Sequence, residues 1–161
     1  MPEVTVIEAD LSDPEHQAAI IRLINAYARD PMGSGRDLPT DVCDRLVSGL
    51  RQHPTTLVFL AFDEATPAGV AICFLGFSTF AAQPLINIHD LAVMPDYQGR
   101  GIGRLLLERV EAKAHDLGCC KLTLEVRADN RRAQRLYQRF GFGDAPSDLG
   151  AVRHWFLQKW L

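Results

Sequence analysis

A glycine-rich stretch near the middle of the chain has the composition of a phosphate-binding loop. Glycines stand at positions 99, 101 and 103, after an apolar segment that ends at Val93 and directly before an amphipathic helical pattern. The first turn of a helix has backbone N–H groups without a partner inside the helix, and glycine leaves them open to a ligand. These N–H groups can surround a phosphate. We call residues 98–104 the cradle.

The cradle departs from two common nucleotide-binding motifs. A P-loop ends in Gly-Lys-Ser/Thr, whereas Gly103 is followed by Arg104 and Leu105. The dinucleotide fingerprint requires a further glycine at the position that Arg104 occupies. What remains is Gln98-x-x-Gly101-x-Gly103 after a Val-x-Pro strand end. A strand-to-helix turn that uses glycine only for tight packing would have the same pattern. This motif alone therefore does not distinguish a phosphate-binding loop from a tightly packed turn.

A second segment, about thirty residues later, has the spacing expected of one βαβ unit. It contains Asn130, Ala133, the pair Leu136-Tyr137 and the pair Gly141-Phe142. Together the two segments resemble the cofactor-binding segments of the GNAT superfamily, the acetyl-CoA-dependent N-acetyltransferases. The resemblance is close over residues 85–142 and extends elsewhere only to the order of the elements.

The resemblance implies that acetyl-CoA is the acetyl donor and indicates which residues hold it. Backbone groups of residues 91–93 would bind the acetyl carbonyl and the pantetheine arm. The cradle would hold the pyrophosphate, with added charge from Arg100 and Arg104, and Asn130 would contact the cofactor while also capping a helix. The predicted cofactor-binding residues are Leu91, Ala92, Val93, Gln98, Gly99, Arg100, Gly101, Ile102, Gly103, Arg104, Asn130 and Tyr137.

Acetyl transfer to an amine needs an unprotonated amine and a proton for the departing thiolate. Alkyl amines have pKa values near ~10 and thiols near ~8.5, so at neutral pH the amine must lose a proton. Tyr137 stands where the family's motif carries its acid, and we predict that it protonates the thiolate. The alternative is a core residue, because Tyr137 shares an apolar helix face with Leu136 and Phe140.

Two neighbouring residues, His89 and Asp90, are candidates for the base. Alternation along a strand sends them to opposite faces unless a bulge intervenes. Histidine titrates near neutrality, which places His89 slightly ahead, although relatives often carry a carboxylate at one of these positions. One of the two is expected to be structural, and both would be if water takes the proton.

The spacing of apolar residues predicts a mixed α/β (α+β) element order with one parallel strand pair. The resemblance implies that this is the GNAT fold, a mixed central sheet with a splayed parallel strand pair flanked by helices. The parallel pair is expected at residues 85–93 and 121–126. We expect the apolar faces of two helices at Val42, Leu46 and Leu50, and at Ile102, Leu105, Leu106, Val110, Ala114 and Leu117. The predicted strands are 3–9, 55–62, 68–77, 85–93, 121–126 and 152–157, and the predicted helices are 14–29, 40–50, 102–117 and 130–140.

Length and composition predict a single domain over residues 1–161. The hydrophobic fraction of 47% and charged fraction of 23% are ordinary, and the net charge of −3 gives no reason to expect nucleic acid. The N-terminus lacks a targeting pattern and no apolar run matches a membrane span, so we expect a cytoplasmic protein. Four cysteines without CxxC spacing predict free thiols and no metal site. The aromatic C-terminal segment fits a dimer interface and fits strand packing equally well.

The expected activity is transfer of an acetyl group from acetyl-CoA to a primary amine of a small molecule, by direct attack in a ternary complex. Two alternatives stay open. One is a non-catalytic acyl-CoA-binding module, and the other is a protein or peptide N-acetyltransferase. Acidic residues such as Asp30 and Asp44 could attract a cationic amine, but a solvated helix face explains them more simply.

Overall fold

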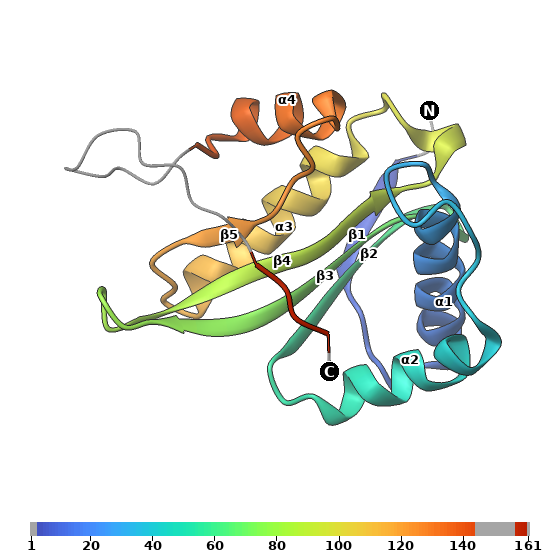
Figure 1. Ribbon diagram of the computed structural model, residues 1–161, viewed down its shortest axis with the longest axis horizontal. Helices are drawn as coiled ribbons and strands as arrows, with labels where there is room; N and C mark the ends of the chain where they lie inside the picture. The colour runs from blue at the N-terminus through green and yellow to red at the C-terminus, as the bar shows by residue number, and fades with distance from the viewer. Residues whose placement is uncertain (1–2, 144–156, 161) are drawn as a thin grey trace.

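The computed structural model describes residues 3–143 and 157–160, and it has a five-stranded sheet between two layers of helices (Figure 1). The strands lie in the order β1-β2-β3-β4-β5, antiparallel except for the parallel pair β4 and β5. The elements are β1 (Val4–Glu8), α1 (Pro14–Arg29), α2 (Thr40–Gln52), β2 (Thr56–Asp63), β3 (Thr66–Ser78), β4 (Gln83–Val93), the short 3-10 helix η1 (Pro95–Tyr97), α3 (Ile102–Asp116), β5 (Leu122–Leu124) and α4 (Arg131–Phe140). The predicted fold class is therefore confirmed, and the strand expected at 152–157 falls, apart from Leu157, outside the described residues.

Two hydrophobic cores lie on the two faces of the sheet. Along β2, Phe59 and Ala61 pack with α3 and α4, whereas Val58 and Leu60 pack with α1 and α2. This alternation is the period of two that a strand covered on both faces must show. Figure 1 shows α4 beside α3, away from α1 and α2.

The helical faces differ in part from those that the sequence predicts. In α3, Leu107 is fully buried, while Leu105 and Leu117 are 37% and 39% exposed. Leu105 is turned about 300° from Ile102, outside the buried arc, and Leu117 follows the last helical residue. In α2, Val47 rather than Val42 is buried beside Leu50, and Leu46 packs at the margin of the core.

The parallel pair opens where β4 leaves β5. Pairing with β5 runs only from Ile86 to Ile88, and the side chain of Asn87 ties the two strands through Thr123 Oγ1 at 3.0 Å. From there β4 continues to Val93 paired with β3 alone. The last five residues of β4 therefore keep one backbone edge open among the described residues.

Two features outside the site concern the chain as a whole. The four cysteines are all free, as predicted; Cys73 is buried and Cys120 is exposed. Within residues 3–143 and 157–160, no helix is both long enough and apolar enough to span a membrane.

Candidate active site

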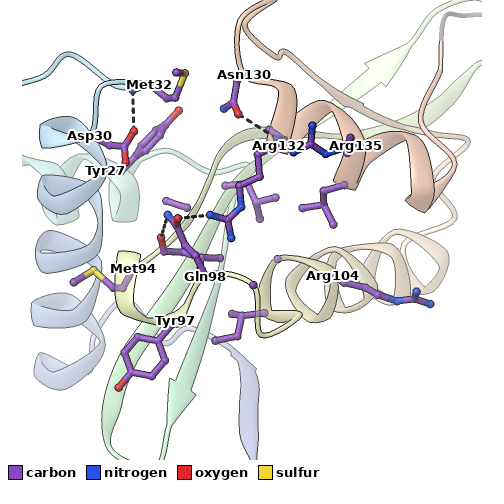
Figure 2. Close-up of a pocket in the computed structure, with 18 of the residues that line it drawn as sticks. Tyr27, Asp30, Met32, Met94, Tyr97, Gln98, Arg104, Asn130, Arg132 and Arg135 are labelled. Carbon is purple, nitrogen blue, oxygen red and sulfur yellow. Dashed lines mark hydrogen bonds between the residues drawn. The ribbon is translucent and has the colours of Figure 1, made fainter.

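A cleft of about 890 Å³ lies beyond the carboxyl end of β4 (Figure 2). Its walls come from the last residues of β4, the start of α3, helix α4 and the end of α1. All of the predicted cofactor-binding residues except Arg100 line it. The position agrees with the rule that ligands of α/β sheets bind outside the carboxyl ends of the strands.

The start of α3 presents backbone donors to the cleft. Gly99 and Gly101 have φ angles of 80° and 82°, which L-residues rarely adopt, and Gly101 is the N-cap of α3. The Leu105 N–H bonds the Gly101 carbonyl at 3.1 Å, so the N–H groups of residues 102–104 precede the first hydrogen bond of the helix. A Cβ placed on Gly101 would find no atom within 4 Å. The cradle therefore has open space in front of unpaired donors.

Gly103 has a different structural reason from Gly101. A Cβ at this position would lie 2.9 Å from Leu136 Cδ2 on α4. The glycine thus allows α3 and α4 to approach each other closely. Close packing against Leu136, which the sequence left open as an alternative, is therefore one reason for this glycine, while its backbone still lines the cleft.

Polar side chains connect the cradle to α4. The Gln98 Nε2 group donates to the Val93 carbonyl at 3.1 Å, and the Gln98 Oε1 atom accepts from Arg132. Figure 2 shows Gln98 and Arg132 pointing toward one another across the cleft. The side chain of Gln98 and the Val93 carbonyl are therefore already engaged. Arg132 is a cleft residue that the sequence analysis did not single out.

Arg100 is the predicted cofactor residue that the structure places elsewhere. Its guanidinium lies 3.2 Å from the Asp63 carboxylate and 5.0 Å from the centre of the Tyr97 ring. Asp63, at the end of β2, thus holds this side chain against the sheet, whereas Arg104 does line the cleft. Position beside a glycine motif gives no information on which way a long side chain turns.

Asn130, the N-cap of α4, and Tyr137 within α4 both line the cleft. Asn130 caps the helix, because its side chain accepts from the Ala133 N–H at 3.1 Å, and its amide NH₂ group is a donor that this bond does not use. Tyr137 is only 9% exposed and packs edge-on against Phe142. Burial, and then the neighbouring Tyr27, raise the pKa of the Tyr137 phenol to about 12. Tyr137 is therefore a core residue and a cleft residue at once.

A β-bulge in β4 changes the geometry of the two candidate bases. Ile72 pairs with Asp90 and Cys73 pairs with Ile88, which leaves His89 as the extra residue. Asp90 lies opposite Ile72 on the α1 and α2 face, and the His89 ring meets Phe74 of the same face at 5.6 Å. His89 and Asp90 therefore share one face, the exception that the alternation rule allows.

The two candidate bases differ in their environments. Asp90 is half-buried, and burial raises the pKa of its carboxyl, an effect that the charge of His89 partly opposes. His89 is exposed. Neither residue lines the cleft directly, but Tyr27 does, and the Asp90 charge contributes to a raised pKa of the Tyr27 phenol, whose main cause is burial. Asp90 thus lies next to the wall that α1 provides.

That wall contains cleft residues that sequence patterns missed. Tyr27 and Met32 line the cleft together with Asp30, whose carboxylate accepts from the Met32 N–H at 2.8 Å (Figure 2). The helix-ending sequence Asp30-Pro31 was the signal that could have indicated them. A helix that ends there directs its last turn and the following loop toward the same side of the cleft.

Comparison with known proteins identifies the family. The profile of the acetyltransferase (GNAT) family matches residues 20–142. The chain belongs to the GNAT acetyltransferase family. The match includes the cradle, β4 with its bulge, and α4, so the residues described above lie in the family's own region.

GNAT relatives with curated functions match over shorter segments. The [ribosomal protein bS18]-alanine N-acetyltransferase of Salmonella typhimurium is 45% identical over 59 residues, which are 37% of this chain and 40% of that protein. The thialysine N-epsilon-acetyltransferase of Bos taurus is 36% identical over 76 residues, 47% of this chain and 44% of that protein. The chain is thus aligned with less than half the length of these relatives.

Solved structures agree over nearly the whole chain. An aminoglycoside acetyltransferase from an uncultured soil metagenomic sample, in complex with sisomicin, has a TM-score of 0.73 at 20% identity and covers 97% of both chains. An aminoglycoside N-acetyltransferase in complex with CoA has a TM-score of 0.75 at 18% identity and covers 98% of this chain and 95% of its own. At this level of identity the likeness concerns the fold.

Proposed function

We propose that this GNAT protein transfers an acetyl group from acetyl-CoA to a primary amine by direct attack in a ternary complex. One observation carries the proposal. A single cleft has unpaired backbone N–H groups at its α3 end, the open edge of β4 along its floor, and the Tyr137 phenol in its wall. Family membership and a structural neighbour in complex with CoA support the choice of donor.

The residues present fit this donor. The cleft volume of about 890 Å³ lies in the range of small-molecule and cofactor sites. The N–H groups of residues 102–104 and the positive end of the α3 dipole favour a pyrophosphate in front of Gly101, where a Cβ would meet no atom within 4 Å. The open edge of residues 89–93, apart from the Val93 carbonyl that Gln98 engages, offers backbone groups to an amide-containing arm, as a sheet edge does to a peptide.

When bound, acetyl-CoA supplies a thioester whose carbon–sulfur bond breaks as the amine nitrogen bonds the acetyl carbon. An alkylammonium acceptor loses two protons, one before its nitrogen can attack and one as the amide forms. We assign removal of the first proton to Asp90, directly or through water, and the second leaves to solvent. A half-buried carboxyl with a raised pKa binds a proton more strongly than an exposed one, which suits a general base. His89, displaced by the bulge onto the same face, is the alternative.

The departing sulfur needs one proton or an equivalent hydrogen bond, which we assign to the Tyr137 hydroxyl. With a pKa of about 12 this phenol stays protonated at neutral pH. It is a weaker acid than a thiol of pKa near ~8.5. Its contribution is therefore a hydrogen bond that stabilises the thiolate as charge develops, and the proton that the sulfur finally takes comes from solvent.

The acceptor that we propose is a small primary amine. Asp30 and Asp90 give the α1 side of the cleft a negative character, which attracts an alkylammonium group. A second candidate is the amino terminus of a protein, favoured by the 45% identity to the ribosomal-protein alanine N-acetyltransferase over 59 residues. Both acceptors require the same donor site and the same base.

An amine panel with detection of the released CoA thiol tests this function. The panel contains a diamine, a lysine analogue with a free side-chain amine, an aminoglycoside, and a hexapeptide that begins with alanine. We expect thiol release with at least one of the first three. Release with the peptide alone would select the protein acceptor, and CoA binding without release from any amine would indicate a binding module that lacks catalysis.

A further inference from the structure

Helix α4 carries an unusual concentration of positive charge. Its ten residues include four arginines and no acidic residue, in a chain whose net charge is −3. Arg131, Arg135 and Arg139 follow each other at intervals of four, which places them in one stripe along the helix. All four arginines are exposed at the surface, and all four line the cleft.

This arrangement is unfavourable for the helix on its own. Like charges at i and i+4 destabilise a helix by about 0.2–0.5 kcal/mol per pair, and cations in the first turn oppose the helix dipole. Other arginines near the cleft have acidic partners: Arg104 pairs with Glu108 at 2.8 Å, and Arg127 with Asp129 at 2.9 Å. Among residues 3–143 and 157–160, no carboxylate lies within ion-pair distance of Arg135 or Arg139.

Arg132, which neighbours the stripe but does not belong to it, links α4 to the cradle. Arg132 reaches the cradle through Gln98, as Figure 2 shows, and Arg135 stands about one turn further along the helix. A ligand with its pyrophosphate in the cradle would therefore meet the stripe with a second anionic group. Arginine is suited to this role because its planar guanidinium can donate two parallel hydrogen bonds to a phosphate.

We propose that Arg131, Arg135 and Arg139 form a second anion site in the cleft, which binds the 3′-phosphate on the adenosine of CoA. The inference rests on the proposed function, since it assumes that CoA occupies the cleft. It adds that the protein distinguishes CoA from the same molecule without this phosphate. The phosphate monoester carries a charge of about −1.5 to −2 at pH 7, which offsets the repulsion within the stripe.

Calorimetric titration with CoA and with 3′-dephospho-CoA tests the second anion site without any acceptor amine. The parent protein is expected to bind CoA at least about 10-fold more tightly than 3′-dephospho-CoA, as for the loss of a charged hydrogen bond. Arg135→Gln should lower the affinity for CoA several-fold and leave that for 3′-dephospho-CoA unchanged. Added salt should reduce the difference between the two ligands. Arg22→Gln, on an exposed position of α1 outside the cleft, is the matched control and should match the parent.

The outcomes separate the two proposals. Equal affinity of the parent for both ligands overturns the second anion site and leaves the proposed function intact. An equal loss for both ligands in Arg135→Gln also overturns it, because the arginine would then act on the shared part of the ligand. Failure of both ligands to bind the parent contradicts the proposed function itself. If a variant does not fold, the affinities of the parent protein for CoA and 3′-dephospho-CoA still test the second anion site.

Discussion

The half-buried position of Asp90 lowers the stability of the fold but suits the carboxyl to act as a base. Burial raises the pKa of its carboxyl because the charged form loses water, so ionisation of this group costs more free energy in the folded state than in the unfolded chain. A carboxyl with a raised folded pKa favours the folded state below its unfolded pKa, and that contribution is lost as pH rises through the folded pKa. The charged Asp90 therefore lowers stability at neutral pH.

We predict that Asp90→Asn raises the melting temperature at pH 7 while kcat/KM falls by about 10² or more. The stability gain should disappear as the pH approaches the ordinary range of aspartate, where the parent carboxyl is protonated as well. In the parent, kcat/KM should rise with pH through an apparent pKa above that of exposed aspartate, and Asn should remove this limb. Melting curves and pH profiles measure both effects.

His89→Ala is the matched comparison, since the bulge places both residues on one face. If Asp90 is the base, this variant keeps the ascending limb. A limb that vanishes in His89→Ala and persists in Asp90→Asn would assign the base to histidine.

The catalytic role of Tyr137 depends on its hydroxyl group, whereas its packing role in the core depends on the ring. Tyr137→Phe keeps the edge-on packing against Phe142, so affinity for CoA should stay within about 2–3-fold of the parent, while kcat falls by about 10². Single-turnover rates and calorimetry measure the two quantities. An unchanged kcat would leave Tyr137 with its packing role alone.

For single residues, the sequence predicted position along the backbone but not the direction in which a long side chain points. The cradle, Asn130 and Tyr137 could be placed from motif spacing because backbone position decides whether they reach the cleft. Arg100 could not, because an ion pair with Asp63, 37 residues away in sequence, determines its direction.

Between elements, the contact of α3 with α4 depends on Gly103. We predict that Gly103→Val lowers the free energy of unfolding by about 1–3 kcal/mol, because the new side chain meets Leu136 Cδ2. Leu136→Ala should have a smaller effect in the Gly103→Val background than in the parent, by more than about 0.5 kcal/mol. Denaturant unfolding of the four proteins measures this coupling.

Gly49→Val in α2 is the control, since a Cβ there would have no neighbour within 4 Å. It should change stability by less than about 0.5 kcal/mol, because valine is slightly better than glycine in a helix. Additive effects of Gly103→Val and Leu136→Ala would show that the two helices do not depend on this contact.

Whole helices and strands were predictable from the sequence where the apolar pattern is sustained over many residues. Helix α1 has the predicted bounds. Helix α4 lies within the predicted range 130–140, between its Asn130 cap and Gly141, which has a φ of 102°. The bulge at His89 could not be located, because an extra residue in β4 is visible only in its register against β3. The buried faces of α2 and α3 shifted because the arc that a helix buries depends on how it lies across the sheet.

On the scale of the whole molecule, the cleft joins elements from both layers of helices. Residues of α1 come from one side of the sheet, and those of α3 and α4 come from the other. A ligand that contacts all three should therefore stabilise the entire fold. At about 100 times its Kd it contributes about 2.7 kcal/mol. For a domain of this size that corresponds to a rise of about 5–10 °C in melting temperature.

The melting temperature with and without CoA, compared between the parent and Gly101→Asn, is the most direct test of the account. Asparagine tolerates the left-handed backbone of Gly101, so this variant should fold while its side chain fills the cradle. Gly118→Asn, with a φ of 68° at the far end of α3 and equal open space, controls for the backbone change. We predict a rise of about 5–10 °C with CoA for the parent and for Gly118→Asn, and about half of it or less for Gly101→Asn. The full rise in Gly101→Asn, or none in the parent, would contradict CoA binding at the start of α3.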